Sequence, residues 1–183
     1  QTEAAPQTPV RLPVCGEQLL PVRRLRARHR AQALGGGRVA PGRGAHVNGS
    51  DVVRIALIGC GGRGSGAAVN ALRNESGANV KLVAMADAFK DRLRGSLNAI
   101  KSRVPDKVDV PEQRQFTGLD CHEKALACDI DMVLLCTPPG FRPMQFEAAV
   151  AAGKHVFMEK PVATDAPGVR RILAANEKAK QKG

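Results

Sequence analysis

The sequence predicts a doubly wound α/β fold, in which a parallel sheet lies between two layers of helices. Two observations carry this prediction. Short apolar runs bounded by glycine or proline, such as "VVRIALIG" (52–59), are typical of strands that are buried on both faces. Each run is followed by a segment whose apolar residues have helical spacing. Strands that alternate with helices pair in parallel through right-handed crossovers.

The expected elements follow one another from residue 52 to residue 181. We expect strands at 52–59, 80–87, 115–118, 131–139 and 155–161. We expect helices at 64–74, across Leu93, Leu97, Ile100 and Val104, at 119–128, through "FEAAVAAG" (146–153), and at 166–181. The first helix presents Ala67, Ala68, Ala71 and Leu72 on its apolar face, and the last presents Val169, Ile172, Leu173 and Asn176.

The first fifty residues differ in character from the rest of the chain. They contain eight arginines, no lysine and two acids, and they show neither a helical nor a strand period. We expect residues 1–50 to form a disordered tail and residues 51–183 to form the domain. Arg23-Arg24 suggests a twin-arginine export signal, although further arginines interrupt the apolar segment that such a signal needs. The expected location is the cytoplasm, or the periplasm if that signal is genuine.

Composition excludes several classes of function. The net charge of +11 divides into +6 in residues 1–50 and +5 in the remainder, and Trp and Tyr are absent. Without aromatic residues beside a basic run we predict no nucleic-acid partner. No stretch reaches the roughly 18 apolar residues that a membrane span requires. The five cysteines show no C-x-x-C spacing, so we predict neither a disulfide framework nor a metal site.

A glycine-rich loop follows the first expected strand and opens a helix. It contains Gly59, Gly61, Gly62, Arg63 and Gly64, in the pattern G-x-G-x-x-G. The first glycine permits a tight turn, the second lets a pyrophosphate approach the backbone, and the third lets helix and strand pack closely. Free N–H groups at the start of the helix attract phosphate charge. The loop therefore predicts a dinucleotide site.

Three alternatives compete with that interpretation of the loop. A glycine-rich turn needs no ligand. A P-loop is disfavoured because Ser65 stands where the phosphate-binding lysine belongs. A methyltransferase also places a glycine loop after its first strand and an acid after its second, so the loop alone does not exclude that class.

Asp87 ends the second expected strand. A carboxylate at this point can accept hydrogen bonds from both ribose hydroxyls of an adenosine. It would repel a 2′-phosphate, so it favours NAD over NADP as the cofactor. Lys90 and Arg92 lie close enough in the sequence to leave NADP possible.

Two later segments resemble a known family. "CTPPGFRP" (136–143) follows the fourth strand, and "AGKHVFMEKPVA" (152–163) spans the fifth. With the glycine loop and Asp87, they are similar to the glucose–fructose oxidoreductase/inositol dehydrogenase (Gfo/Idh/MocA) family over residues 51–183. The resemblance implies an NAD(P)-binding Rossmann domain of an oxidoreductase.

The resemblance also implies roles for individual residues. Lys160 matches the family lysine beside the nicotinamide and the substrate hydroxyl, which makes it the candidate catalytic residue. An ammonium there could stabilise oxyanion character and relay a proton. Glu159 resembles the residue that reaches the nicotinamide-side ribose, and Thr137 and Pro138 resemble a wall beside the cofactor. His155 is interpreted as structural, and His122 as structural or exposed.

Family enzymes carry a second α/β domain with the substrate pocket and a dimer-forming sheet, and this chain shows no counterpart. We therefore expect a fragment of a homo-oligomeric enzyme that oxidises a sugar, cyclitol or related polyol. One alternative is an NAD-dependent glycoside hydrolase of the same family. Another is a non-catalytic dinucleotide-binding module, which would tolerate Lys160→Ala.

Overall fold

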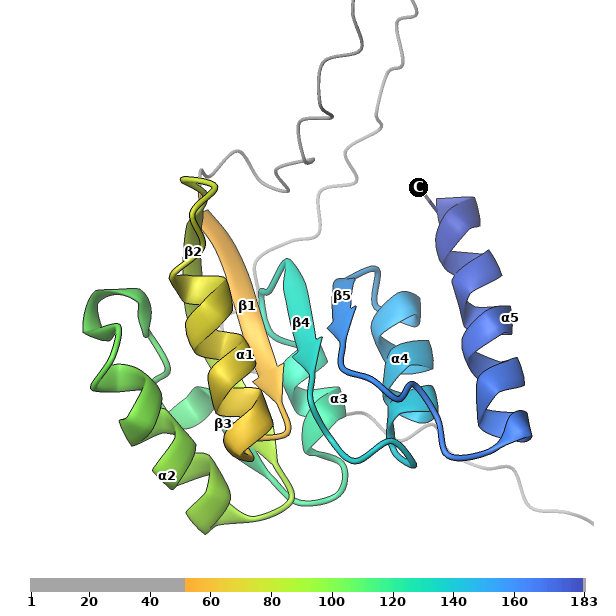
Figure 1. Cartoon of the computed structure of the whole chain (residues 1–183), viewed down its shortest axis with the longest axis horizontal. Coiled ribbons are helices and arrows are strands. Elements are labelled where there is room, and N and C mark those ends of the chain that lie inside the picture. The colour runs from red at the N-terminus through yellow and green to blue at the C-terminus, as the bar shows by residue number, and fades with distance from the viewer. Residues whose placement is uncertain (1–51, 183) are drawn as a thin grey trace, which may run out of the picture.

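The computed structural model describes residues 52–182 and contains a five-stranded parallel sheet in the order β3-β2-β1-β4-β5 (Figure 1). The strands are β1 (Val52–Ile58), β2 (Asn79–Asp87), β3 (Gln115–Thr117), β4 (Met132–Leu135) and β5 (His155–Met158). The helices are α1 (Gly62–Leu72), α2 (Lys90–Lys101), α3 (Cys121–Leu126), α4 (Arg142–Ala151) and α5 (Ala166–Lys182), with 3₁₀ turns at Pro105–Lys107 and Glu112–Arg114. The predictions for residues 1–50, Arg23-Arg24 among them, lie outside the described residues.

Helices cover both faces of the sheet, which confirms the predicted fold class. Successive side chains of a strand point to opposite faces, and β1 divides its residues accordingly. Ile55 and Leu57 pack with the apolar residues of α1 and α2, whereas Ala56 and Ile58 pack with those of α3 and α4. Since β1 has neighbours on both sides, it forms the buried centre of a three-layer domain. Helix α5 packs against α4 at the edge of the molecule (Figure 1).

The register of the sheet aligns the carboxyl ends of four strands. Ile58 at the end of β1 pairs with Ala86 of β2 and with Leu135 of β4. Leu135 in turn pairs with Met158 of β5. The residues that come next are Gly59, Asp87, Cys136 and Glu159, so these four positions lie in one row along the edge of the sheet. In doubly wound sheets, ligands bind beyond this edge.

Several elements are shorter than predicted, and proline explains most of the differences. β4 stops at Leu135 and β5 at Met158, rather than at 139 and 161. The segments that follow contain Pro138, Pro139 and Pro161, which have no N–H group to donate to a ladder. Helix α2 ends at Lys101, so the prediction that Val104 lies in this helix is wrong. Val104 precedes Pro105, and the residue before a proline avoids the helical region.

Helix α5 buries a different set of residues from the one its apolar pattern suggests. Val169 and Leu173 are exposed, and the buried positions are Gly168 and Ala175. Small residues at these positions let α5 lie close to α4. Among residues 52–182, no helix is both long and apolar enough to cross a bilayer.

Candidate functional site

The glycine loop connects β1 to α1, and two of its positions have room for no residue other than glycine. Gly59 has a φ of +94°, and a Cβ built there would lie 2.5 Å from the Thr137 nitrogen. A Cβ on Gly64 would lie 1.9 Å from the carbonyl oxygen of Gly59. Such distances are far inside van der Waals contact. Gly59 therefore permits the turn and Gly64 permits the close packing of α1 on β1, the two steric reasons that the sequence suggested.

The middle of the loop is open. Gly61 is the N-cap of α1, and a Cβ placed on Gly61 or Gly62 would meet no atom within 4 Å. The N-cap makes no side-chain hydrogen bond to the helix, and the first turn contains no acidic residue. The N–H groups of this turn are free of intrahelical partners and lie at the positive end of the helix dipole. This opening suits an anion such as a phosphate.

Asp87 links the end of β2 to the glycine loop. Its carboxylate accepts hydrogen bonds from the backbone N–H of Cys60, at 2.6 Å, and from that of Phe89, at 2.9 Å. A carboxylate offers about four lone-pair sites. Asp87 can therefore hold the loop and still accept hydrogen bonds from a ligand.

A cavity of about 650 Å³ lies beyond the carboxyl ends of β1, β2 and β4. It brings together several predicted site residues, namely Gly59, Gly61, Asp87, Thr137 and Pro138, and it also meets Arg92 and Phe89. Lys90 is not among its lining residues. The cavity thus places the glycine loop and the strand-end acid beside the expected wall of β4.

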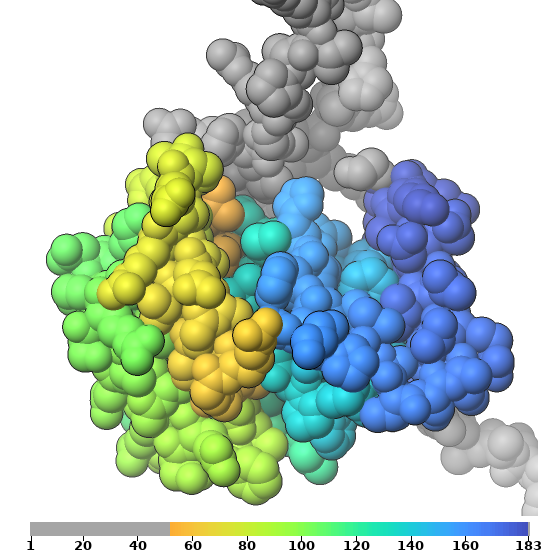
Figure 2. Space-filling model, viewed as in Figure 1, coloured from red at the N-terminus to blue at the C-terminus, as the bar shows by residue number. Residues whose placement is uncertain are grey.

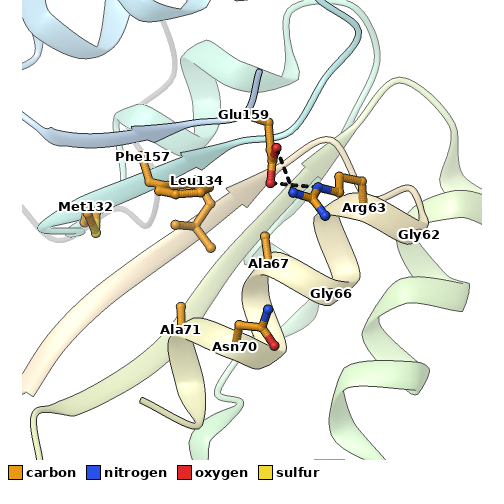
Figure 3. A pocket seen from close by; sticks show the side chains of 10 residues that line it. All are labelled: Gly62, Arg63, Gly66, Ala67, Asn70, Ala71, Met132, Leu134, Phe157 and Glu159. Carbon is orange, nitrogen blue, oxygen red and sulfur yellow. Dashed lines mark hydrogen bonds and ion pairs between the residues drawn. The ribbon is translucent and has the colours of Figure 1, made fainter. Parts of the chain in front are cut away.

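A second hollow, of about 500 Å³, lies between α1 and the strands β4 and β5, and Gly62, Arg63 and Glu159 line one end of it (Figure 3). In the space-filling view, α1 and the β5 segment lie side by side on the face toward the reader (Figure 2). Arg63 and Glu159 bridge them through two contacts. Nε of Arg63 lies 2.8 Å from one carboxylate oxygen of Glu159, and Nη2 lies 3.2 Å from the other.

The Arg63–Glu159 pair is unequal in exposure. The Glu159 side chain is 7% exposed and that of Arg63 is 72% exposed. The hydrogen bond from Arg63 lowers the pKa of the Glu159 carboxyl below its usual value of 4.5. Glu159 therefore stays ionised at neutral pH, and its carboxylate faces the start of α1.

Lys160 follows Glu159 at the same edge of the sheet and is exposed. Its ammonium makes no hydrogen bond or ion pair within the part of the chain that the structure describes. It is thus free to meet a ligand that reaches the β5 end of the row.

Two polar residues of this region were not predicted as site residues from the sequence. Arg142 and Gln145 are each 5% exposed at the start of α4, and both contact Thr137. Nε of Arg142 donates to the Thr137 carbonyl at 2.7 Å, and the Thr137 hydroxyl donates to the Gln145 side-chain oxygen at 2.5 Å. Their spacing of three residues on a helix that also buries Ala149 and Val150 is the sequence signal that could have revealed them.

Burial keeps the thiols near the cavity protonated. Burial raises the pKa of Cys60 far above its ordinary value, and burial also raises the pKa of Cys121 and of Cys136 to about 11. All three remain protonated thiols at neutral pH. His155 is exposed at the amino end of β5, away from the site, and His122 is buried in α3.

Comparison with known proteins agrees with this geometry. The family model described as "Oxidoreductase family, NAD-binding Rossmann fold" (Gfo/Idh/MocA) matches residues 53–182. The chain belongs to this family. The segment is accordingly an NAD-binding Rossmann domain of an oxidoreductase family, as its motifs suggested.

Similar Gfo/Idh/MocA proteins are longer. Inositol 2-dehydrogenase from Rhizobium meliloti is 32% identical over 71% of this chain and 34% of its own length. Glycosyl hydrolase family 109 protein 1 from Bacteroides fragilis is 29% identical over 72% of this chain and 27% of its own. The crystal structure of scyllo-inositol dehydrogenase from Lactobacillus casei with bound NAD(H) and scyllo-inositol matches with a TM-score of 0.56 and 25% identity, over 71% of this chain and 34% of that one. The chain thus spans between 27% and 34% of the length of these relatives.

Proposed function

We propose that this domain binds the cofactor of an NAD-dependent dehydrogenase that oxidises a secondary hydroxyl of a sugar or cyclitol. One observation carries the proposal: the sheet aligns Gly59, Asp87, Cys136 and Glu159 in one row along its edge. This row brings the glycine loop and Asp87 to the same edge as Thr137 and Lys160, which directly follow Cys136 and Glu159. The relatives named as inositol dehydrogenases support the choice of substrate class.

Each part of the row has a role in holding the dinucleotide. Gly61, Gly62 and the first turn of α1 would receive the pyrophosphate. Asp87 would accept the adenosine ribose hydroxyls, which selects NAD over NADP. Thr137 and Pro138 would wall the cofactor on the β4 side.

Glu159 and Arg63 belong to the β5 end of the site. Glu159 would accept hydrogen bonds from the nicotinamide-side ribose. Its carboxylate is already held by Arg63, so the ribose would share or replace that contact. Arg63 lies within the glycine loop and its side chain is exposed, so it would turn toward the pyrophosphate by giving up its contacts with Glu159.

Lys160 is the candidate catalytic residue. Bound NAD supplies the acceptor for the hydride that leaves the substrate carbon. The hydroxyl on that carbon must lose its proton as the C–O bond becomes a carbonyl. The Lys160 ammonium would hydrogen-bond this oxygen and stabilise the negative charge that develops on it, and Lys160 would relay the proton away.

The wider features that we propose for the enzyme are supported by the family to which the chain belongs. We infer that a domain comprising residues 51–183 works with a second α/β domain that supplies the substrate pocket, and that the enzyme is a homo-oligomer. We propose that it works in the cytoplasm, or in the periplasm if Arg23-Arg24 belongs to a genuine export signal. We infer no nucleic-acid partner.

The test uses the protein that carries this chain together with its substrate domain. We expect NAD reduction with at least one member of a panel of cyclitols and sugars. Lys160→Ala should keep NADH affinity and lower kcat by about a hundredfold or more. Lys178→Ala, which changes an exposed lysine of α5, is the matched control and should behave as the wild type. An active Lys160→Ala enzyme would remove this residue from the mechanism.

The glycoside hydrolase relative favours a second candidate. In that case the domain would hold NAD tightly, oxidise a sugar carbon, and have the hydride returned after the glycosidic bond is cleaved. The two candidates differ in their net redox change. Accumulation of NADH indicates the dehydrogenase, whereas release of an aglycone without net NADH formation indicates the hydrolase.

A further inference from the structure

Arg142 is a buried charge that forms no salt bridge within residues 52–182, although its charge, after the hydrogen bond from Arg63, also helps to lower the pKa of the nearby Glu159 carboxyl. It is the first residue of α4 and is 5% exposed. Burying a charge is costly unless hydrogen bonds compensate for the lost water. The compensation comes from three carbonyl groups. Nε donates to Thr137 at 2.7 Å, and Nη1 donates to Glu159 at 2.6 Å and to Pro161 at 2.5 Å.

These carbonyls belong to two separate loops. Thr137 lies in the loop after β4, whereas Glu159 and Pro161 lie in the loop after β5. The two carbonyls on Nη1 flank Lys160 on either side, so one nitrogen fixes the backbone around this residue. A planar guanidinium offers donors in a rigid fork, and it can therefore hold both loops at once.

We propose that Arg142 is a positioning residue for the nicotinamide half of the cofactor site. By joining the β4 loop to the β5 loop, it sets the distance between the Thr137 wall and Lys160. The inference rests on the proposed function, because it concerns the same dinucleotide site.

The other half of the site is held by different contacts. The Gly59 N–H donates to Ala86 at 2.9 Å, and Asp87 holds the Cys60 N–H. Neither contact involves α4 or the two loops that Arg142 joins. The glycine loop also touches these loops, because Gly59 lies against the Thr137 nitrogen and Arg63 pairs with Glu159. Since the two contacts to β2 remain without Arg142, its loss should disturb the nicotinamide end far more than the adenosine and phosphate end.

Two nucleotides separate the two halves experimentally. ADP occupies only the adenosine and pyrophosphate positions, whereas NADH fills the whole site. We would titrate the full 183-residue chain and its Arg142→Lys and Arg142→Met variants with each nucleotide, under conditions where circular dichroism shows every variant folded. Arg171→Met is the matched control, because Arg171 pairs with Glu147 between α5 and α4 and makes no contact with either loop.

We expect both Arg142 variants to bind NADH about tenfold more weakly, the loss typical of one charge-assisted hydrogen bond, and to bind ADP as the wild type does. Arg171→Met should bind both nucleotides normally. In the nucleotide-free chain, amide hydrogen exchange across 159–162 should accelerate in Arg142→Lys, while exchange in the glycine loop stays unchanged. This second measurement needs only the conservative variant.

Equal losses of NADH and ADP affinity would show that Arg142 only supports the fold, and unchanged NADH affinity with unchanged exchange would also overturn the proposal. Failure of the wild-type chain to bind either nucleotide would instead contradict the proposed function. The two failures are thus distinguishable.

Discussion

Gly61 is a position where the fold tolerates a side chain and a bound cofactor would not. Gly59 and Gly64 are fixed by the protein itself, because a Cβ at either would collide with backbone atoms. At Gly61 the backbone is extended and nothing lies within 4 Å of a Cβ. The fold therefore does not require glycine at this position, and a ligand that approaches the backbone would.

Gly61→Val should abolish NADH binding and leave the free energy of unfolding nearly unchanged, because the new side chain would occupy the place of the pyrophosphate. Gly66→Val is the matched control. Gly66 lies one turn into α1, and a Cβ there also meets no atom within 4 Å. Calorimetric titration and urea unfolding of both variants check this. Normal NADH affinity in Gly61→Val would contradict the phosphate role of the loop.

Asp87 shows how much of a residue's role the sequence can predict. Its position at the end of a strand suggested a ribose acceptor. Its hydrogen bonds to the N–H groups of Cys60 and Phe89 could not be predicted, because they depend on how the loop after β1 folds against the end of β2. Asp87 is both a candidate ligand contact and part of the loop's own structure.

At the scale of elements, Arg63 and Glu159 connect the start of α1 to the end of β5 across the open side of the sheet (Figure 3). Arg63 lowers the pKa of Glu159 in the folded state. A lowered carboxyl pKa contributes stability above the unfolded-state value, and this contribution disappears as the pH falls through the folded-state value.

Arg63→Gln should therefore lower the free energy of unfolding near neutral pH and make little difference once the pH is well below the usual glutamate value of 4.5. Urea unfolding of wild type and variant across this range measures the difference. Lys124→Gln, which removes the exposed ion pair between Lys124 of α3 and the N-cap residue Asp120, is the control and should produce a smaller change near neutral pH. A difference that persists unchanged in acid would show that the charge pair is not its source.

The order and type of the main helices and strands could be predicted from local patterns, whereas some boundaries and faces could not. The end of α2 could have been predicted from Pro105, since the residue before a proline disfavours the helical conformation. The buried face of α5 could not, because it depends on α4. Small residues at Gly168 and Ala175 pack there while Leu173 stays exposed.

The site divides in the same way. Residue type and spacing are enough to predict the glycine loop, Asp87 and the segment around Lys160 as candidate site residues. Arg142 and Gln145 were not predicted, because their hydrogen-bond partners are carbonyl and hydroxyl groups of loops whose positions depend on the folded sheet. Polar residues three apart on an otherwise apolar helix face are a usable signal for such contacts.

At the scale of the whole molecule, stability depends on the two apolar layers that meet at β1. Leu57 is fully buried in the layer between the sheet and the first two helices. Leu57→Ala should lower the free energy of unfolding by about 2–5 kcal/mol. Leu173→Ala is the matched control, because Leu173 is 60% exposed, and it should cost less than about 0.5 kcal/mol. Similar losses in urea unfolding of the two variants would contradict the assigned core.

The most direct measurement is a titration of the 183-residue chain and its Asp87→Ala variant with NADH and with NADPH, followed by nicotinamide fluorescence or heat. We predict saturable binding with NADH preferred, and a preference that shrinks or reverses in the variant, because the carboxylate that accepts the ribose hydroxyls and repels a 2′-phosphate is gone. A general loss of folding in the variant would weaken the binding of both nucleotides and leave the ratio of their affinities unchanged. A folded wild-type chain that binds neither nucleotide, or a folded Asp87→Ala variant with an unaltered ratio of NADH to NADPH affinity, would contradict the assignment of this edge of the sheet as an NAD site.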